Sequence, residues 1–208
     1  MDYKTTIWNL LLADIKNEFG VAGLMGNLEA ESGLIPYRVQ GDFSNGYTDS
    51  IEYTAKVDSG QISEYDFVNN GPGGGGYGLA QWTFYTRKQE LYNRYKSGYP
   101  SIGNVNLACD FLLYELKTSY TSVYWTLVNA ITIKEASDKV LHEFEKPADQ
   151  SESVEVKRTQ MGIAIYEELT GTSGGGGGGT STTTKRNKKF NFILFNKQRR
   201  TTWIRKHS

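Results

Sequence analysis

One glutamate, Glu31, has a position at which a carboxyl group could act as a general acid. It follows Leu28 by three residues, which places it at the margin of the apolar face of an expected helix, whereas Glu29 points to solvent. It also lies in the last turn, at the negative end of the helix dipole. Burial and this negative end both disfavour a charged carboxylate. The position therefore predicts a carboxyl group that keeps its proton near neutral pH, as acid-catalysed cleavage of a glycosidic bond requires. From spacing alone, however, a solvated glutamate near a helix end is the favoured interpretation, since Glu is common in helices.

A second run, Gly-Tyr-Gly-Leu-Ala-Gln-Trp-Thr at residues 76–83, has side chains that could hold a sugar. The Gln81 amide both donates and accepts hydrogen bonds, and the rings of Tyr77 and Trp82 could stack on sugar faces. A core position is the alternative for Trp82. The glycines at 73–76 are not followed by Gly-Lys-Ser/Thr, so this run is not expected to bind a nucleotide.

The elements that position these side chains are expected to be helices, because apolar residues recur along the chain at spacings of three and four. The first helix is expected to end at Gly20, the second at Gly33 and the fourth at Pro147. The apolar stripes are Trp8-Leu11-Leu12-Ile15-Phe19, Val21-Leu24-Met25-Leu28, Leu107-Phe111-Leu112-Tyr114, Ile133-Ala136-Val140-Leu141-Phe144 and Met161-Ala164-Ile165-Leu169. Residues 37–78 lack this periodicity and are expected to form a long irregular segment that could contain short strands. The expected fold class is mainly α.

The charge of the 208-residue chain is unevenly distributed, although 23 Lys and Arg balance 23 Asp and Glu. Residues 185–208 carry nine basic and no acidic side chains, which leaves 14 basic and 23 acidic ones in residues 1–184. Six glycines at 174–179, flanked by Ser and Thr, are typical of a flexible linker. The sequence therefore predicts a domain over residues 1–171, a linker over 172–184 and a basic aromatic tail over 185–208.

Several classes of protein do not fit this sequence. No run of 18 apolar residues exists, so no transmembrane segment is expected. The N-terminus lacks the basic region of a signal peptide. The lone Cys109 excludes a disulfide framework, and no Cys/His spacing suits zinc, so neither a metal nor a cofactor is expected. An amidase or peptidase would lack its usual Cys/His or metal ligands.

Residues 31–36 (Glu-Ser-Gly-Leu-Ile-Pro) resemble the Glu-Ser-x-x-x-Pro signature of goose-type lysozymes and lytic transglycosylases. The chain is most similar to the phage tail lysozyme family. The matching segments are residues 26–32, residues 53–60 (Tyr-Thr-Ala-Lys-Val-Asp-Ser-Gly), the run at 76–83, Arg87-Lys88, and Phe-Glu-Lys-Pro at 144–147 followed by Arg158. They occur in order over residues 5–170 and leave the tail uncovered. Lys146 departs from the family, which often has Arg there, and the glycines at 73–76 indicate a looser cleft rim.

The resemblance implies a lysozyme-like domain that cleaves the glycan strands of bacterial peptidoglycan, with Glu31 as the catalytic acid and residues 76–83 lining the cleft. The bond is the β-1,4 linkage between N-acetylmuramic acid and N-acetylglucosamine, broken by hydrolysis or as in a lytic transglycosylase. The protein is then expected on the virion tail, made in the bacterial cytoplasm and acting on the host cell wall. The rival is a lysozyme-like module that binds the wall without cleaving it, and such a module has no need of Glu31.

A hydrolase needs a second carboxylate, at ~6.5–9.5 Å in inverting and ~5–5.5 Å in retaining glycosidases, whereas a transglycosylase can use a hydroxyl group of its substrate. Asp58 is the first candidate because it lies in the matching segment 53–60, ahead of Asp42, Asp49 and Asp66. Asp58 could instead open a turn with Ser59-Gly60. Glu145 and Arg158 are expected to form a structural ion pair between two helices.

The tail has an apolar run at residues 190–195 between clusters of Lys and Arg. It could add a strand to the sheet of another phage tail protein, lie on anionic wall polymer or membrane, or begin a truncated module. A docking or anchoring peptide is the favoured interpretation.

Overall fold

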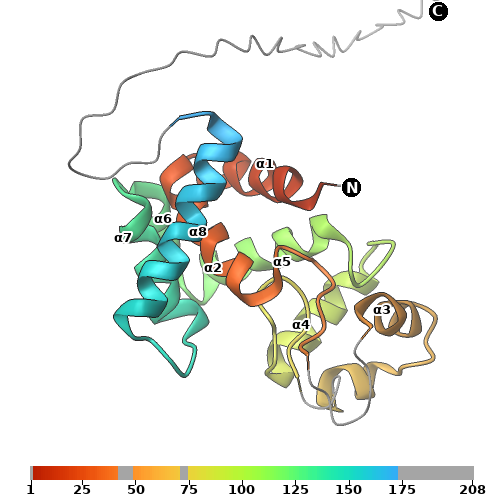
Figure 1. Cartoon of the computed structure of the whole chain (residues 1–208). Coiled ribbons are helices and arrows are strands. Elements are labelled where there is room, and N and C mark those ends of the chain that lie inside the picture. Colours follow the sequence, from red (N-terminus) through yellow and green to blue (C-terminus); the bar gives the residue numbers. More distant parts are fainter. Residues whose placement is uncertain (1, 42–48, 71–74, 173–208) are drawn as a thin grey trace, which may run out of the picture. The chain divides into compact units, whose positions relative to one another are not determined.

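The computed structural model describes residues 2–41, 49–70 and 75–172 (Figure 1). The expected tail, and all of the expected linker except Thr172, lie outside these residues. The described helices are α1 (Tyr3–Ile15), α2 (Glu18–Ser32), α3 (Ser50–Asp58), α4 (Tyr85–Lys96), α5 (Val105–Thr118), α6 (Thr121–Asn129), α7 (Ile133–Val140) and α8 (Glu152–Thr170), with π-helical segments η1 (Asp66–Asn70) and η2 (Leu141–Glu145). The fold is mainly α, as the sequence predicts.

The segment at residues 37–78 differs from the prediction. It contains α3 and η1 rather than a long irregular stretch. Within the described residues, β pairing is limited to isolated bridges that join Tyr77 to Val39 and to Trp82. None of the helices in the described part of the chain has the length and apolar character of a membrane span.

The central helix is α2, which packs against α1, α6, α7 and α8. Its residues from Gly20 to Leu28 are all buried, so the helix is enclosed on every side. The Asn17 side chain caps its start and Gly33, at φ +62°, ends it where the sequence predicts. The prediction that the first helix runs to Gly20 is wrong, because α1 ends at Ile15 and Lys16 takes the left-handed conformation.

Two glycines let α2 and α8 approach each other closely (Figure 1). A Cβ atom added at Gly26 would lie 2.4 Å from the carbonyl oxygen of Arg158. A Cβ atom added at Gly162 would lie 2.6 Å from the carbonyl oxygen of Ala22. Both contacts are closer than real Cβ atoms tolerate, so glycine is needed at both positions for the two backbones to meet. This packing places α8 alongside α2, with Arg158 next to Gly26 and Gly162 next to Ala22.

A second group of elements contains η1, α4 and α5, and α5 joins it to the first group by packing against α1 and α6. Its core is aromatic: the ring of Phe67 lies 5.3 Å from that of Tyr77 and 5.9 Å from that of Tyr92. Trp82 packs on Phe111 of α5 with ring centroids 4.9 Å apart. The chain leaves α2 just after Glu31 and reaches this second group, so Glu31 stands at the boundary between the two.

Candidate active site

Glu31 opens into a cavity of about 300 Å³. The cavity is formed by the end of α2, the turn at residues 78–84, the start of α4 and the end of η2. Its lining residues are Glu31, Gln40, Ala80, Gln81, Thr83, Phe84, Arg87 and Glu145. Two of the residues that the sequence singled out for a site, Glu31 and Gln81, therefore share one cavity.

The Glu31 carboxylate is held by Arg158 of α8. The Nη2 atom of Arg158 donates to Oε1 of Glu31 at 2.5 Å, and the two side chains are 8% and 22% exposed. The predicted ion pair between Arg158 and Glu145 is therefore replaced by one between Arg158 and Glu31. The guanidinium therefore fixes the orientation of the Glu31 side chain at the cavity.

Arg158 is itself fixed by a buried amide. Its Nη1 atom donates to Oδ1 of Asn27 at 3.1 Å, and Asn27 is fully buried in the middle of α2. The Asn27 Nδ2 atom donates to the carbonyl oxygens of Gly23 and Ser137, at 3.0 and 3.1 Å. A chain of hydrogen bonds thus runs from α7 through α2 and α8 to Glu31, and it leaves Arg158 little freedom to move.

Glu145 is the second carboxyl group of the cavity. It is the last residue of η2, and its Oε1 atom is buried without a hydrogen-bond partner in the described structure. Burial, and after it the negative charge of Glu31, raise the pKa of Glu145 to about 8, although the positive charges of Arg87 and Arg158 limit this rise. At neutral pH, Glu145 therefore keeps its proton.

Arg87, which lines the cavity, forms an ion pair with a third glutamate, Glu115, which does not line it. Its Nε and Nη2 atoms donate to Oε1 and Oε2 of Glu115 at 2.6 and 2.8 Å. Glu115, 5% exposed, also accepts a hydrogen bond from Nε1 of Trp82 at 2.7 Å. The Arg87 guanidinium lies 5.1 Å from the centre of the Phe144 ring. These contacts fix the start of α4 against α5 and η2.

Trp82 and Tyr77, which the sequence suggested as sugar-stacking residues, are both fully buried. The Tyr77 hydroxyl group shares a hydrogen bond of 2.8 Å with Thr54, and neither ring lines the cavity of Glu31. In this structure their faces are covered by protein, so both act as core aromatics. The exposed ring at the cavity is that of Phe84, which is 72% exposed and which the sequence did not single out.

Gln81 lines the cavity, but its amide nitrogen is engaged by the backbone. Nε2 donates to the carbonyl oxygens of Arg38 and Gly78, at 3.1 and 3.0 Å. The Gln81 backbone has φ +43°, a conformation that costs energy for a residue with a Cβ atom. The side chain therefore links the turn after Tyr77 to the segment that follows α2.

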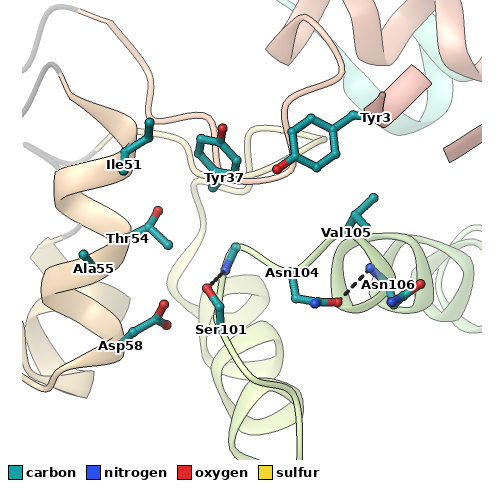
Figure 2. A pocket seen from close by; sticks show the side chains of 11 residues that line it. Tyr3, Tyr37, Ile51, Thr54, Ala55, Asp58, Ser101, Asn104, Val105 and Asn106 are labelled. Carbon is teal, nitrogen blue, oxygen red and sulfur yellow. Dashed lines mark hydrogen bonds between the residues drawn. The ribbon is translucent and has the colours of Figure 1, made fainter. Parts of the chain in front are cut away.

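Asp58, the first candidate for a second carboxylate, lies in another cavity. This cavity has a volume of about 510 Å³, and Figure 2 shows Asp58 of α3 facing Ser101 there, with Tyr3 and Tyr37 on the far side. The Asp58 Oδ1 atom accepts a hydrogen bond from the Ile102 backbone at 2.8 Å. This cavity and that of Glu31 have no lining residue in common.

The remaining candidates are also accounted for. Asp49 caps α3, Asp66 accepts a hydrogen bond from Ser63, and Asp42 lies outside the described residues. Within residues 2–41, 49–70 and 75–172, no cluster of three or more His, Cys, Asp or Glu is arranged to hold a metal ion. Cys109 is buried, which raises the pKa of its thiol to about 12.

Sequence reasoning placed Arg158 and Glu145 in a structural pair and did not assign Arg87 to the site. One feature of the sequence could have linked these three residues to the site: all of them lie in segments that resemble the family, at positions 87, 144–147 and 158. Their convergence on Glu31 depends on how α4, η2 and α8 pack, which no local pattern reveals.

Comparison with known proteins identifies the family of this chain. No curated protein and no solved structure matches the chain. The family model described as phage tail lysozyme matches residues 2–169, which include every residue of the Glu31 cavity. Since this match spans most of the chain, the protein belongs to the phage tail lysozyme family.

Proposed function

We propose that the protein cleaves the glycan strands of peptidoglycan, at the β-1,4 bond between N-acetylmuramic acid and N-acetylglucosamine, with Glu31 as the general acid. The observation that carries this proposal is the position of Glu31. It stands in the last turn of α2, opens into a cavity with Gln81 and Phe84, and has one carboxylate oxygen held by Arg158. Membership of the phage tail lysozyme family supports the same reaction.

The proposed reaction uses the two oxygens of Glu31 differently. Arg158 holds Oε1, which leaves Oε2 to carry a proton toward the bridging oxygen of the bound glycan. As the bond between C1 and this oxygen breaks, the electron pair stays on the oxygen and the Glu31 proton neutralises it. Water or a hydroxyl group of the substrate then bonds to C1, and its proton restores the acid. The exposed Phe84 ring would stack on a neighbouring sugar.

The test is the variant Glu31→Gln, which removes the proton and nearly preserves the shape of the side chain. General acid catalysis contributes ~10²–10⁴-fold, so clearing of a purified wall suspension should fall to about 1% or less of the wild-type rate. Glu29→Gln is the matched control, because Glu29 lies on the same helix but does not line the cavity. A fully active Glu31→Gln, or equal losses in the two variants, would remove Glu31 from the catalytic role. Wall binding without cleavage by the wild type would favour a non-catalytic module.

The products identify the second half of the reaction. Mass spectrometry of the released muropeptides should detect reducing ends if water attacks C1, and anhydro ends if a substrate hydroxyl group does. Asp58→Asn separates the two carboxyl candidates, because the amide keeps the hydrogen bond to Ile102 but cannot act as a base. We expect this variant to retain most activity, since Asp58 lies outside the Glu31 cavity.

The proposed place of action is the host cell wall, reached from the virion tail. The family name supports a tail-associated protein. Peptidoglycan is the proposed partner of the domain, and other tail proteins or anionic wall polymer are the proposed partners of residues 185–208.

A further inference from the structure

Three carboxyl groups around the cavity share two guanidinium groups. Arg158 pairs with Glu31 at 2.5 Å, and Arg87 pairs with Glu115 through two hydrogen bonds of 2.6 and 2.8 Å. Glu145 has no ion pair within the described residues, although both arginines and both other glutamates act on it electrostatically. If all three carboxyl groups were ionised, the cluster would carry one more negative than positive charge.

The burial of Glu145 makes that excess charge costly. Its Oε1 atom is shielded from solvent and accepts no hydrogen bond, so water and hydrogen-bond donors would stabilise a negative charge on this carboxylate only in part. A protonated carboxyl group removes the excess charge. Glu145, the one carboxyl group of the three that lacks a cation, therefore keeps its proton beside the Glu31 side chain that Arg158 orients.

We propose that Glu145 is a positioning residue of the catalytic site, which keeps Arg158 on Glu31 by remaining protonated, and whose loss of that proton sets the alkaline limit of activity. This inference rests on the proposed role of Glu31. Ionised Glu145 would compete with Glu31 for Arg158 and with Glu115 for Arg87, and would place a like charge beside Glu31. The carboxyl group that transfers the proton to the substrate would then lose its fixed orientation.

The pH dependence of kcat/KM on a soluble glycan oligomer tests this proposal. Wild-type activity should fall about tenfold per pH unit above pH 8, where the raised pKa of Glu145 lies. Glu145→Gln is permanently neutral and nearly isosteric. It should lower kcat/KM by less than about tenfold at pH 6.5 and should lack the fall above pH 8. Glu143→Gln, on the same segment with its own partner Lys139, is the control and should keep the wild-type profile.

Two outcomes would overturn the proposal. One is a Glu145→Gln enzyme whose activity still falls near pH 8. The other is a folded Glu145→Gln enzyme that is inactive at every pH, because the proton would then be consumed in the reaction rather than retained. Both outcomes are distinct from failure of the proposed function, which is decided by Glu31→Gln alone.

Stability gives a second readout that needs no activity. The folded-state pKa of Glu145 is raised from 4.5 to about 8, so between these values the folded protein binds more protons than the unfolded chain. The free energy of unfolding should therefore fall as pH rises through this window, and the loss should be complete above pH 8. Glu145→Gln should remove this component.

The variant Glu31→Gln keeps the test available if Glu145→Gln fails to fold. It removes the negative charge that raises the pKa of Glu145. The pH at which the fall in the free energy of unfolding is complete should therefore be lower in this variant than in the wild type. If this pH were the same in Glu31→Gln and in the wild type, the proposed coupling between the two carboxyl groups would be contradicted.

Discussion

The Nη2 atom of Arg158 lies 2.5 Å from Oε1 of Glu31, although 127 residues separate the two in the chain. Arg158 comes from the first half of α8 and Glu31 from the last turn of α2. The same guanidinium binds the buried Asn27, so its position is fixed by the core before any substrate arrives. Glu31 is thus oriented by the tertiary packing of two helices rather than by its own helix end.

Changing Arg158 should separate charge from geometry. Arg158→Lys keeps the charge, but a single ammonium group replaces the planar fork that serves both Asn27 and Glu31. We expect kcat to fall by more than tenfold with a smaller loss of stability. Arg158→Ala also leaves Glu31 without its cation. Breaking a buried ion pair typically lowers the free energy of unfolding by ~3–5 kcal/mol. We expect a loss near the lower end of this range, because Glu31 is 22% exposed.

Urea unfolding and steady-state kinetics measure both effects of Arg158. Lys4→Ala, which breaks the exposed pair with Glu168, is the control and should cost about 0–1 kcal/mol. An Arg158→Lys enzyme with the kcat of the wild type would mean that Glu31 needs no fixed orientation.

Gln81→Ala should lower stability together with activity. The substitution removes the two hydrogen bonds that the side chain donates to the carbonyl oxygens of Arg38 and Gly78, each of which contributes roughly 1 kcal/mol to the free energy of unfolding. For a domain of this size, that loss lowers Tm by roughly 4–8 °C. Gln89→Ala, whose bonds to Glu64 and Asn93 are exposed, should change stability by only about 0.5 kcal/mol. Reduced activity at an unchanged Tm would instead assign the Gln81 amide to the substrate.

Phe84→Ala should raise KM and leave the fold intact. The ring is 72% exposed and gives α4 no side-chain cap, so its removal should change stability by about 0.5 kcal/mol or less. Loss of a partly buried sugar contact of about 1 kcal/mol corresponds to roughly a fivefold rise in KM. Trp125→Ala removes another exposed ring, on α6 and outside the Glu31 cavity, and should leave KM unchanged. Equal KM values for wild type and Phe84→Ala would exclude the stacking role.

Deleting residues 174–208 should leave a folded domain that still cleaves soluble glycan fragments, because the last described helix ends at Thr170. The deletion removes nine basic side chains and should weaken association with whole anionic walls. If charge is responsible, the difference should shrink as salt rises, since charges are screened over ~8 Å at physiological ionic strength. Wall pull-down across a salt series measures this.

Two results would change this view of the tail. If residues 190–195 add an apolar strand to a partner, salt should matter little and Phe192→Asp should abolish binding. Unfolding of the truncated protein would make the tail part of the fold.

The helices that the sequence predicts are those with long apolar stripes, whereas the three it misses, α3, α4 and α6, each bury only one or two aliphatic side chains. In α3 the buried residues are Tyr53, Thr54 and Val57, and in α4 the buried face includes Lys88. Neither gives a recognisable apolar period. The error at the end of the first helix has a different cause. Phe19 follows Ile15 by four residues and continues the stripe, but Asn17 caps a new helix between them.

The part of the candidate site that depends on a single short segment, the position of Glu31, was predictable. Glu31 stands in a local pattern, at the end of an apolar helix and before Ser32 and Gly33, so its place could be read from the sequence. The pairing of Arg158 was not predictable, because Glu31 and Glu145 are both carboxyl groups and only the packing of α8 on α2 selects between them. The fate of Trp82 likewise depended on Glu115, which accepts its N–H group inside the core.

The close contact of α2 with α8 limits how this site can be altered or transferred. A single methyl group at Gly26 or Gly162, outside the cavity and without charge, would push the two backbones apart. The guanidinium of Arg158 would move with its helix, and Glu31 would remain in place without its support. A screen for folded but inactive variants should therefore recover substitutions at these two glycines. Any transplant of the proposed acid to another scaffold must carry the narrow spacing of these two helices along with the charged residues.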